Sequence, residues 1–158
     1  MFRSMRRNKQ ALSKEECFSL LKNEKRAVLA VNGDDGYPYA IFVNYIFDEN
    51  ENAIYLHGAK EGHKIDSLKK CDKVCFSIHN DGEKIDGDWA YTVKSVVIFG
   101  RASLISDINV TTSKVRDLAL KYYPNKDDVE KEIEGSIKYV QLIKIEIENI
   151  TGKVIKEK

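Results

Sequence analysis

The stretch YPYAIFVNYIF, residues 37–47, decides the fold class of this chain. Alternate residues of an extended strand point to opposite sides, so Tyr39, Ile41 and Val43 share one side while Ala40 and Phe42 share the other. Both sides are largely apolar. A strand of this kind suits a barrel wall that is covered on its outside by a helix or by a second subunit.

Further strands are predicted on both sides of this segment because β-branched and aromatic residues are enriched there. The Asp-Gly pair that ends at Gly36 indicates a hairpin turn before residue 37. Gly100 lies inside a long apolar run and indicates a bulge or a close backbone approach. A turn is predicted at 150–153. The predicted strands are 27–31, 37–47, 53–57, 74–78, 89–105 and 139–147.

Four helices are predicted around these strands. Ser13 and Glu16 have the spacing of a capping box, and Cys17, Leu20 and Leu21 follow at helical spacing. A second helix is predicted to begin near Glu61. A third covers 112–123 and ends before Pro124, and a short acidic helix covers 127–134.

The order of these elements favours a mainly β fold. Strands outnumber helices, and the only convincing strand–helix–strand unit surrounds residues 61–70, so a doubly wound parallel sheet does not fit. We therefore expect a mostly antiparallel barrel with peripheral helices. A length of 158 residues suits a single domain over 1–158, with residues 1–10 expected to be flexible.

Composition and charge exclude several classes of protein. The chain has 26 Lys and Arg against 25 Asp and Glu, so no overall field attracts nucleic acid or an anionic membrane. The basic first residues lack the apolar region of a secretory signal, and no apolar run reaches transmembrane length. We expect a cytoplasmic protein without nucleic-acid or membrane partners.

The cysteines do not predict a disulfide framework or a metal site. Cys17, Cys71 and Cys75 form an odd set, which indicates free thiols. The spacing of Cys71, Cys75 and His79 is compatible with zinc, but in an extended strand Cys75 and His79 would lie about 13 Å apart. No metal site is therefore predicted.

The segment HGAKEGHK, residues 57–64, is the strongest candidate for a binding site. The chain leaves a strand, crosses Gly58 and Gly62 and enters a helix, whose free N–H groups and dipole attract anions. Lys64 adds an ammonium group. The segment is not a Walker A loop, because only three residues separate the glycines and His63 precedes the lysine. A glycine-rich connector with a solvated lysine explains the pattern equally well.

Other polar residues are weaker candidates. Asn44 lies between apolar neighbours and needs a partner, which is a ligand, an adjacent strand or a buried water. His57 ends a strand beside the glycines and is either a surface histidine or a ligand donor that acts as an acid near neutral pH. Lys94 and Ser95 interrupt an apolar strand, so they face a ligand, a partner chain or solvent.

Several segments, taken in order, resemble one known family over about residues 6–153. It is the nitroimidazole-resistance branch of the pyridoxamine phosphate oxidase-like, FMN-binding split-barrel proteins. The resemblance implies a six-stranded antiparallel split barrel that forms a homodimer with two FMN sites at the subunit interface. The segments are Gly36–Tyr39, Val43–Tyr45, Tyr55–Ala59, Gly62–Lys64, Ser95–Ala102 and Thr151–Lys153.

The resemblance also implies roles for individual residues. Lys64 matches the phosphate lysine, in a loop that includes Gly62 and His63. Lys94 and Ser95 match the strand that contacts the flavin of the partner subunit. The residues that match the flavin-ring and ribityl contacts are Val43, Asn44 and Tyr45 on one strand and His57, Gly58 and Ala59 on the next.

The family resemblance leaves several functions open. Residues 39–47 lack the basic residue that pyridoxamine phosphate oxidases use for the cofactor phosphate, so oxidation of vitamin B6 is not expected. The first hypothesis is an FMN-dependent reductase of small, electron-poor molecules such as nitroimidazoles, with His57 as proton donor. The residues do not identify the electron donor, for which NAD(P)H is one candidate. The alternatives are a flavin carrier or sensor, and a haem-handling protein with His57 and His63 as axial ligands.

Overall fold

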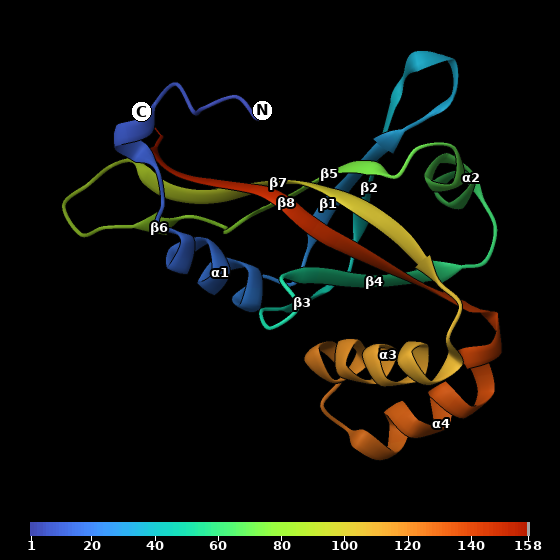
Figure 1. Ribbon diagram of the computed structural model, residues 1–158. Helices are drawn as coiled ribbons and strands as arrows, with labels where there is room; N and C mark the ends of the chain where they lie inside the picture. Colours follow the sequence, from blue (N-terminus) through green and yellow to red (C-terminus); the bar gives the residue numbers. More distant parts are fainter. Residues whose placement is uncertain (158) are drawn as a thin grey trace.

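The computed structural model describes residues 1–157 and contains one antiparallel sheet with four α-helices around it (Figure 1). The strands are β1 (Ala27–Asn32), β2 (Pro38–Val43), β3 (Ile46–Asp48), β4 (Ala53–Ala59), β5 (Lys73–His79), β6 (Glu83–Lys84), β7 (Tyr91–Ile105) and β8 (Val140–Lys156). The helices are α1 (Lys14–Asn23), α2 (His63–Lys70), α3 (Ile108–Tyr122) and α4 (Lys126–Ser136). Short 3-10 turns occupy Asn8–Gln10, Asp34–Gly36 and Ile137–Tyr139.

The sheet forms a split barrel, as the sequence predicted. Its strand order is β2-β1-β5-β7-β8-β4-β3, with β6 paired to β7. The first and last strands of this path, β2 and β3, are consecutive in sequence and are joined by Asn44 and Tyr45. The chain therefore passes from one edge of the sheet to the other at these two residues, which we call the barrel seam.

The single strand predicted over residues 37–47 is wrong, because the barrel seam divides it. The Tyr45 ring is fully buried and meets Phe76 edge-on, with the ring centroids 5.0 Å apart. The Tyr45 N–H donates to the Tyr122 hydroxyl over 2.9 Å, and the Tyr45 carbonyl accepts from Lys121 Nζ at 3.3 Å. Side chains of α3 thus replace the strand partners that Tyr45 lacks.

The two sides of β2 differ in burial. Val43 points into the barrel, whereas Phe42 on the outer side is 84% exposed. No element described here covers that side, so the apolar outer face that the sequence predicted remains open in a single chain.

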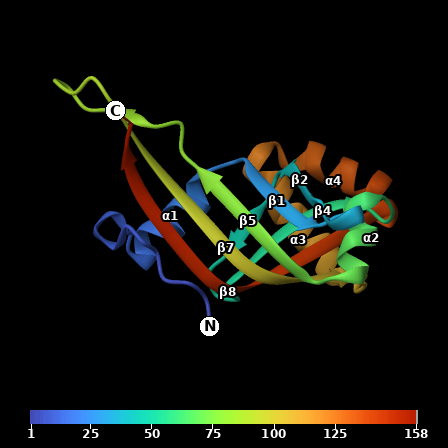
Figure 2. The same cartoon turned by 90° about the horizontal axis from the view of Figure 1, so that it is seen from above.

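β7 and β8 form the longest ladder and run side by side along the molecule (Figure 2). The register shifts between Phe99 and Gly100, which confirms the bulge predicted there. A Cβ at Gly100 would overlap the carbonyl oxygen of Glu146 on β8. The glycine is therefore required by the close approach of the two strands.

The turn predicted at 150–153 is wrong, because β8 continues through these residues to Lys156. Gly152 pairs with Val96 inside the ladder. A Cβ at Gly152 would overlap the sulfur of Cys17 and come within 3.1 Å of Leu12. This glycine serves the packing of α1 against the sheet.

Helix α1 has the predicted capping box: the Glu16 N–H donates to Ser13 Oγ over 3.1 Å, and the Ser13 N–H donates to Glu16 Oε2 over 2.9 Å. Helix α3 begins at Ile108, before the predicted residue 112. The reason is Asp107, whose carboxylate accepts the N–H groups of Asn109 and Val110.

Helices α3 and α4 lie together beneath the sheet and cover the outer side of β4 (Figure 1). Their apolar sides form a second hydrophobic core, separate from the interior of the barrel. Among residues 1–157, no helix is both long and apolar enough to span a bilayer. The buried residues of the second core are Ala53, Tyr55, Val115, Val129, Ile133 and Leu142.

The cysteines are free, as expected. Cys17 is buried, whereas Cys71 and Cys75 are half-buried, and the Asn32 amide donates to the Cys71 sulfur over 3.1 Å. Within residues 1–157, no three His, Cys, Asp or Glu side chains are placed to share a metal ion.

Candidate functional site

The end of β4 and the start of α2 place Lys64 against Gly58. Gly62 precedes α2 with a φ of 116°, a conformation that favours glycine, and it offers no side chain to cap the helix. Lys64 lies in the first turn and its side chain runs back toward β4. A Cβ at Gly58 would come within 2.8 Å of Lys64 Nζ, so the absence of a side chain at Gly58 makes room for the ammonium group.

Lys64 lies in a groove of about 330 Å³ that contains two cations. Lys64 is half-buried, and neither it nor Arg26 forms an ion pair with any residue in the described range 1–157. Burial lowers the pKa of Lys64. Two cations without carboxylates favour an anionic ligand. The groove is lined by Arg26, Phe42, Val43, Asn44, His57 and Lys64.

His57 projects from β4 into the same groove. Burial by surrounding protein atoms, and then the charge of Lys64, lower the pKa of its imidazole. This lowering favours the neutral ring, in which one nitrogen donates and the other accepts a hydrogen bond.

The barrel seam forms another wall of the groove. Asn44 lines it directly, while Val43 turns its side chain into the barrel. Tyr45 does not expose its ring to the groove, because that ring lies in the core. The backbone of Tyr45 is hydrogen-bonded to Tyr122 and Lys121 of α3, so the contribution of Tyr45 to the groove is to fix the position of Asn44.

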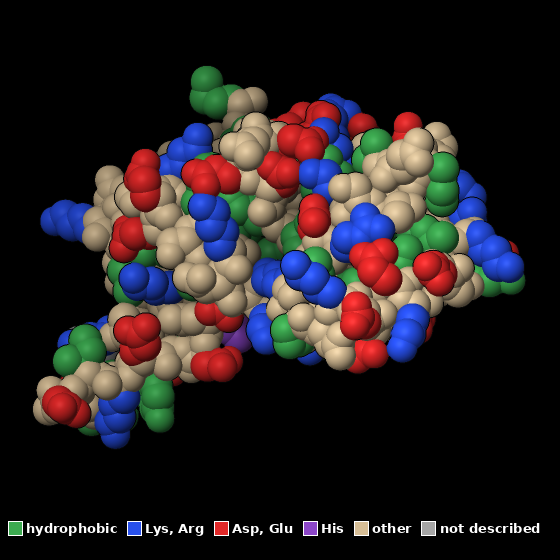
Figure 3. Space-filling model, turned by 90° about the horizontal axis from the view of Figure 1, so that it is seen from below, with side chains coloured by type: hydrophobic (Ala, Val, Ile, Leu, Met, Phe, Trp, Pro, Cys, Tyr) green, Lys and Arg blue, Asp and Glu red, His purple; other side chains and the backbone are tan. Residues whose placement is uncertain are grey.

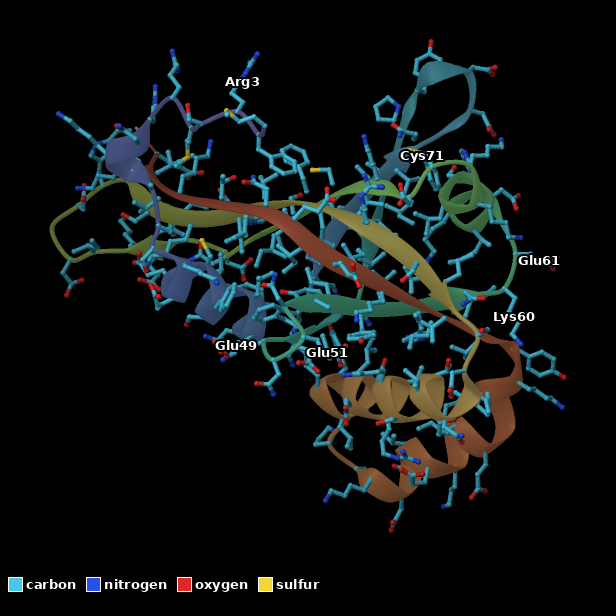
Figure 4. All side chains as sticks on the ribbon, in the orientation of Figure 1. Arg3, Glu49, Glu51, Lys60, Glu61 and Cys71 are labelled. Atoms are coloured by element: carbon cyan, nitrogen blue, oxygen red, sulfur yellow. The ribbon has the colours of Figure 1, made fainter. Side chains whose placement is uncertain are left out.

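Other predicted site residues lie elsewhere. The His63 ring stacks on Tyr39, with centroids 4.1 Å apart, and its Nε2 lies 3.5 Å from Asp34. His63 does not line the groove that contains His57. Ala59 is exposed and pairs with Val140 at the end of β4. Figure 4 shows the neighbouring Lys60 on the loop between β4 and α2, at the outer edge of the molecule.

Lys94 and Ser95 also lie outside the groove. The Lys94 ammonium is 3.6 Å from Glu16 of α1. Ser95 lies on the outer face of the sheet and lines a second hollow of about 530 Å³. That hollow shares Arg26 and Phe42 with the groove, so the two spaces adjoin. The flavin contacts predicted for Lys94 and Ser95 belong to a partner subunit and stay predictions.

Sequence reasoning missed Arg26 and Phe42. The signal for Arg26 is weak: a basic pair, Lys25 and Arg26, stands directly before the predicted strand at 27–31. The signal for Phe42 was its place on the outer side of the strand beside Asn44. Pairing between β1 and β2 sets Val28 opposite Phe42, which brings Arg26 close to the barrel seam.

A comparison with protein families finds one that covers nearly all of this structure. The model described as pyridoxamine 5'-phosphate oxidase matches residues 13–154. The chain belongs to this family. The match contains every element from α1 into β8, and it confirms the family resemblance predicted from the sequence. No curated protein matches the chain.

Solved structures with the same fold confirm the architecture of this family member. A candidate 5-nitroimidazole antibiotic resistance protein from Bacteroides thetaiotaomicron is 19% identical, with 92% of this chain and 87% of that chain covered and a TM-score of 0.78. A FAD-binding protein from Mesorhizobium loti is 22% identical, with coverages of 92% and 97% and a TM-score of 0.69. A FAD and heme binding protein from Mycobacterium smegmatis is 17% identical, with coverages of 95% and 74% and a TM-score of 0.73.

Proposed function

We propose that this protein binds FMN in the groove beside the barrel seam and reduces small, electron-poor organic molecules such as nitroimidazoles. The observation that carries the proposal is the pairing of two uncompensated cations, Arg26 and Lys64, with the start of α2. A phosphate dianion needs a cation and oriented N–H groups. Lys64 supplies the cation in the groove, and the first N–H groups of α2, the helix that Lys64 belongs to, would supply the donors.

The residues of the groove suit FMN in three respects. Lys64 and the first N–H groups of α2 would bind the phosphate. Arg26, which no carboxylate among residues 1–157 neutralises, would stabilise negative charge on the flavin ring. Bound FMN supplies the electron transfer to the acceptor. His57 would hold a hydrogen bond to the bound molecule in its neutral form. Its imidazolium form, which the lowered pKa makes a stronger acid, would pass a proton to the reduced product and regain one from solvent.

Family membership supports a flavin, and so do the names of two similar structures. The Mesorhizobium loti protein is named for FAD binding, and the Mycobacterium smegmatis protein is named for FAD and heme binding. The Bacteroides thetaiotaomicron protein is named for nitroimidazole resistance, which supports the acceptor class.

We further propose that the protein acts as a homodimer, with each flavin site completed by the partner. The outer face of the sheet carries two adjacent rows of side chains without charge. The first row crosses five strands in register: Phe42, Val28, Ser77, Val97 and Thr151. The second row is Ala40, Ala30, Cys75, Phe99 and Asn149.

This face has the character of an interface. Phe42 is 84% exposed, and Phe99 is 43% exposed with the Phe2 ring stacked on it at 5.9 Å between centroids. Exposed apolar patches of this kind mark protein–protein contacts. The hollow that contains Ser95 lies on the same face and adjoins the groove. A second copy seated on this face would therefore bring its own residues next to the flavin.

The absorption spectrum of the purified protein, followed by titration with FMN, FAD, riboflavin and haem, tests the proposal. We expect a flavin spectrum or saturable FMN binding, and oxidation of NAD(P)H by a nitroimidazole in the presence of the protein. A protein that stays colourless after FMN addition contradicts flavin binding. Tight FMN binding without turnover by any donor and acceptor identifies a carrier or sensor, and a Soret band unaffected by excess FMN identifies a haem protein.

A further inference from the structure

A second cleft, of about 700 Å³, opens beneath the sheet between α3, α4 and β4. It meets the FMN groove at Asn44 and His57, which line both spaces. A ligand in this cleft would therefore lie next to the proposed flavin. The remaining lining residues are Val115, Leu118, Ala119, Tyr122, Tyr123, Pro124, Asn125, Asp128, Val129, Glu132, Ile133, Ser136 and Val140.

The charge of this cleft is opposite to that of the groove. Asp128 and Glu132 lie one turn apart on α4, on the same side of the helix, and both are exposed. Neither forms an ion pair within residues 1–157. No Lys or Arg among the described residues lines the cleft, whereas the groove contains Arg26 and Lys64 and no carboxylate.

Only acidic side chains, Asp128 and Glu132, carry charge in the cleft, and this pattern does not extend to the surface around it. Figure 3 views the side of the molecule that α3 and α4 form, and there acidic and basic side chains are intermixed. The cleft therefore has a local preference that the surrounding surface does not share, as expected where a site discriminates by charge.

The rest of the lining suits an apolar body. Buried Val129 and Ile133 lie on the α4 side and Leu118 on the α3 side. The half-buried Tyr122 ring also lines the cleft, and the Arg26 guanidinium lies 5.4 Å from its centroid. Tyr122 is held in place because its hydroxyl accepts the Tyr45 N–H and donates to the Lys25 carbonyl over 2.7 Å. A rigid aromatic side chain above an aliphatic floor favours a ring-bearing ligand.

We propose that the cleft between α3 and α4 binds small organic cations that consist of an apolar, ring-bearing body and an amine. The body packs between Tyr122 and the aliphatic floor, and the ammonium group faces Asp128 and Glu132. Anionic molecules are disfavoured. The bound amine is a substrate only if the groove holds FMN as proposed, whereas the binding itself does not depend on the flavin.

Three ligands with one ring system and different charges test the proposal: 2-naphthylmethylamine, 2-naphthylmethanol and 2-naphthoate. Binding to the full-length protein is measured by calorimetry before and after FMN addition. We expect the amine to bind about tenfold more tightly than the alcohol, from two solvent-screened charge interactions, and naphthoate to bind most weakly. Equal or tighter binding of the alcohol overturns the proposal.

Matched variants locate the effect. In the double variant Asp128→Asn/Glu132→Gln we expect the preference for the amine to disappear while affinity for the alcohol is kept. Glu134→Gln changes a carboxylate on α4 that does not line the cleft, so it should leave the preference unchanged. Ala119→Trp fills the cleft and should remove binding of all three ligands. A preference for the amine that survives in the double variant overturns the proposal.

The flavin-binding proposal and the cleft proposal can be contradicted independently of each other. Calorimetry without FMN reports on the cleft alone, and the FMN titration reports on the groove alone. Amine binding in a protein that takes up no flavin would support the cleft and contradict the proposed function. Flavin binding with no preference for the amine would support the proposed function and contradict the cleft proposal.

Discussion

Lys64 owes its half-buried position to a residue that has no side chain. Gly58 leaves the space that the lysine ammonium occupies, and no carboxylate in the described part of the chain neutralises that charge. The cost of burying the cation lowers its pKa, so a bound phosphate would recover free energy that the free protein lacks. A basic residue on a connector thus becomes a specific anion site.

Replacement of Lys64 by Ala should weaken FMN binding about 10- to 100-fold, because one charge-assisted hydrogen bond to phosphate is lost. Riboflavin lacks the phosphate, so its affinity should change little. Fluorescence titration with both ligands measures the difference. Lys60→Ala, in the loop just before α2 and at the outer edge of the molecule, is the control and should bind FMN normally. Equal losses for FMN and riboflavin would show that Lys64 does not contact the phosphate.

Gly152, like Gly58, leaves space that a neighbouring side chain occupies, here in the core. Gly152→Ala forces a methyl group against Cys17 and Leu12, so α1 must move and the free energy of unfolding should fall by about 1–3 kcal/mol. Gly135 in α4 has no atom within 4 Å of a built Cβ, and Gly135→Ala should stabilise the protein by about 0.5–1 kcal/mol. Urea denaturation of both variants checks the opposite signs. A neutral effect at Gly152 would mean that α1 adjusts without cost.

At the scale of elements, the barrel seam depends on α3. Tyr122→Phe removes the hydroxyl that accepts the Tyr45 N–H and leaves that group without its partner, which should lower stability by about 1–3 kcal/mol. Exchange of the Tyr45 amide hydrogen should accelerate more than exchange in β7. Tyr123→Phe changes an adjacent, exposed ring and should have no effect on either quantity. Unchanged exchange at Tyr45 in the Tyr122 variant would contradict this role.

A charged cluster ties α3 to the hairpin between β3 and β4. The Glu51 carboxylate accepts hydrogen bonds from Lys114 over 2.8 Å and from Tyr55 over 2.6 Å, and Lys144 lies 3.0 Å away (Glu51 is labelled in Figure 4). These contacts, with Lys114 first, lower the pKa of Glu51 from 4.5 to about 2. The folded chain therefore resists protonation of Glu51 more than the unfolded chain does.

This difference predicts how stability depends on pH. The contribution of Glu51 is complete above its unfolded pKa of 4.5 and is lost as the pH falls toward 2. Because the Glu51 side chain is 38% exposed, we expect solvent screening to reduce the contribution to about 1 kcal/mol. Glu51→Gln should be less stable than the wild type at pH 6 and nearly equal to it at pH 2.5, by urea denaturation. Glu61→Gln, on the exposed loop before α2, should match the wild type at both values.

An element can be predicted from the sequence when the residues that stabilise it lie close to it along the chain. Helix α1 was predictable because Ser13 and Glu16 are three residues apart and both caps are local. The break at Tyr45 was not predictable, because the hydroxyl that permits it belongs to Tyr122, 77 residues away. The turn predicted at Gly152 is wrong for the same reason, because this glycine is required by Cys17 on α1.

The candidate site divides in the same way. His57, Gly58 and Lys64 form one continuous segment, so their juxtaposition follows from a strand, a short loop and a helix. Arg26 joins the groove only through pairing of β1 with β2, and the cleft exists only because α3 and α4 return beneath β4. Both features depend on contacts between distant segments, so the sequence alone contains no signal for the place of Arg26 in the groove or for the cleft.

At the scale of the whole molecule, the open outer face of the sheet predicts self-association. Val97→Asp places a carboxylate in the first uncharged row, between Ser77 and Thr151, and should weaken the dimer at least about 100-fold, because a buried, unpaired charge costs several kcal/mol. Val97 does not line the groove that contains Lys64, so a parallel loss of FMN affinity would show that the partner completes the site. Light scattering and FMN titration measure the two effects.

Asn50→Asp, in the exposed turn between β3 and β4, adds the same charge away from the face and is the control. It should leave both the mass and the FMN affinity unchanged. A wild-type protein that is monomeric at micromolar concentration, yet binds FMN, would contradict the dimeric site.

The barrel seam also bears on aggregation. The peptide bond between Asn44 and Tyr45 lies in the two-residue link between the two strands that end the sheet, and each of these strands has a backbone partner on one side only. Proteolytic cleavage there would leave every ladder of the sheet intact but would release two unprotected edges at once. A nicked molecule would then offer a donor edge and an acceptor edge for further copies, so an intact backbone at this bond guards the fold against growth into strand-paired polymers.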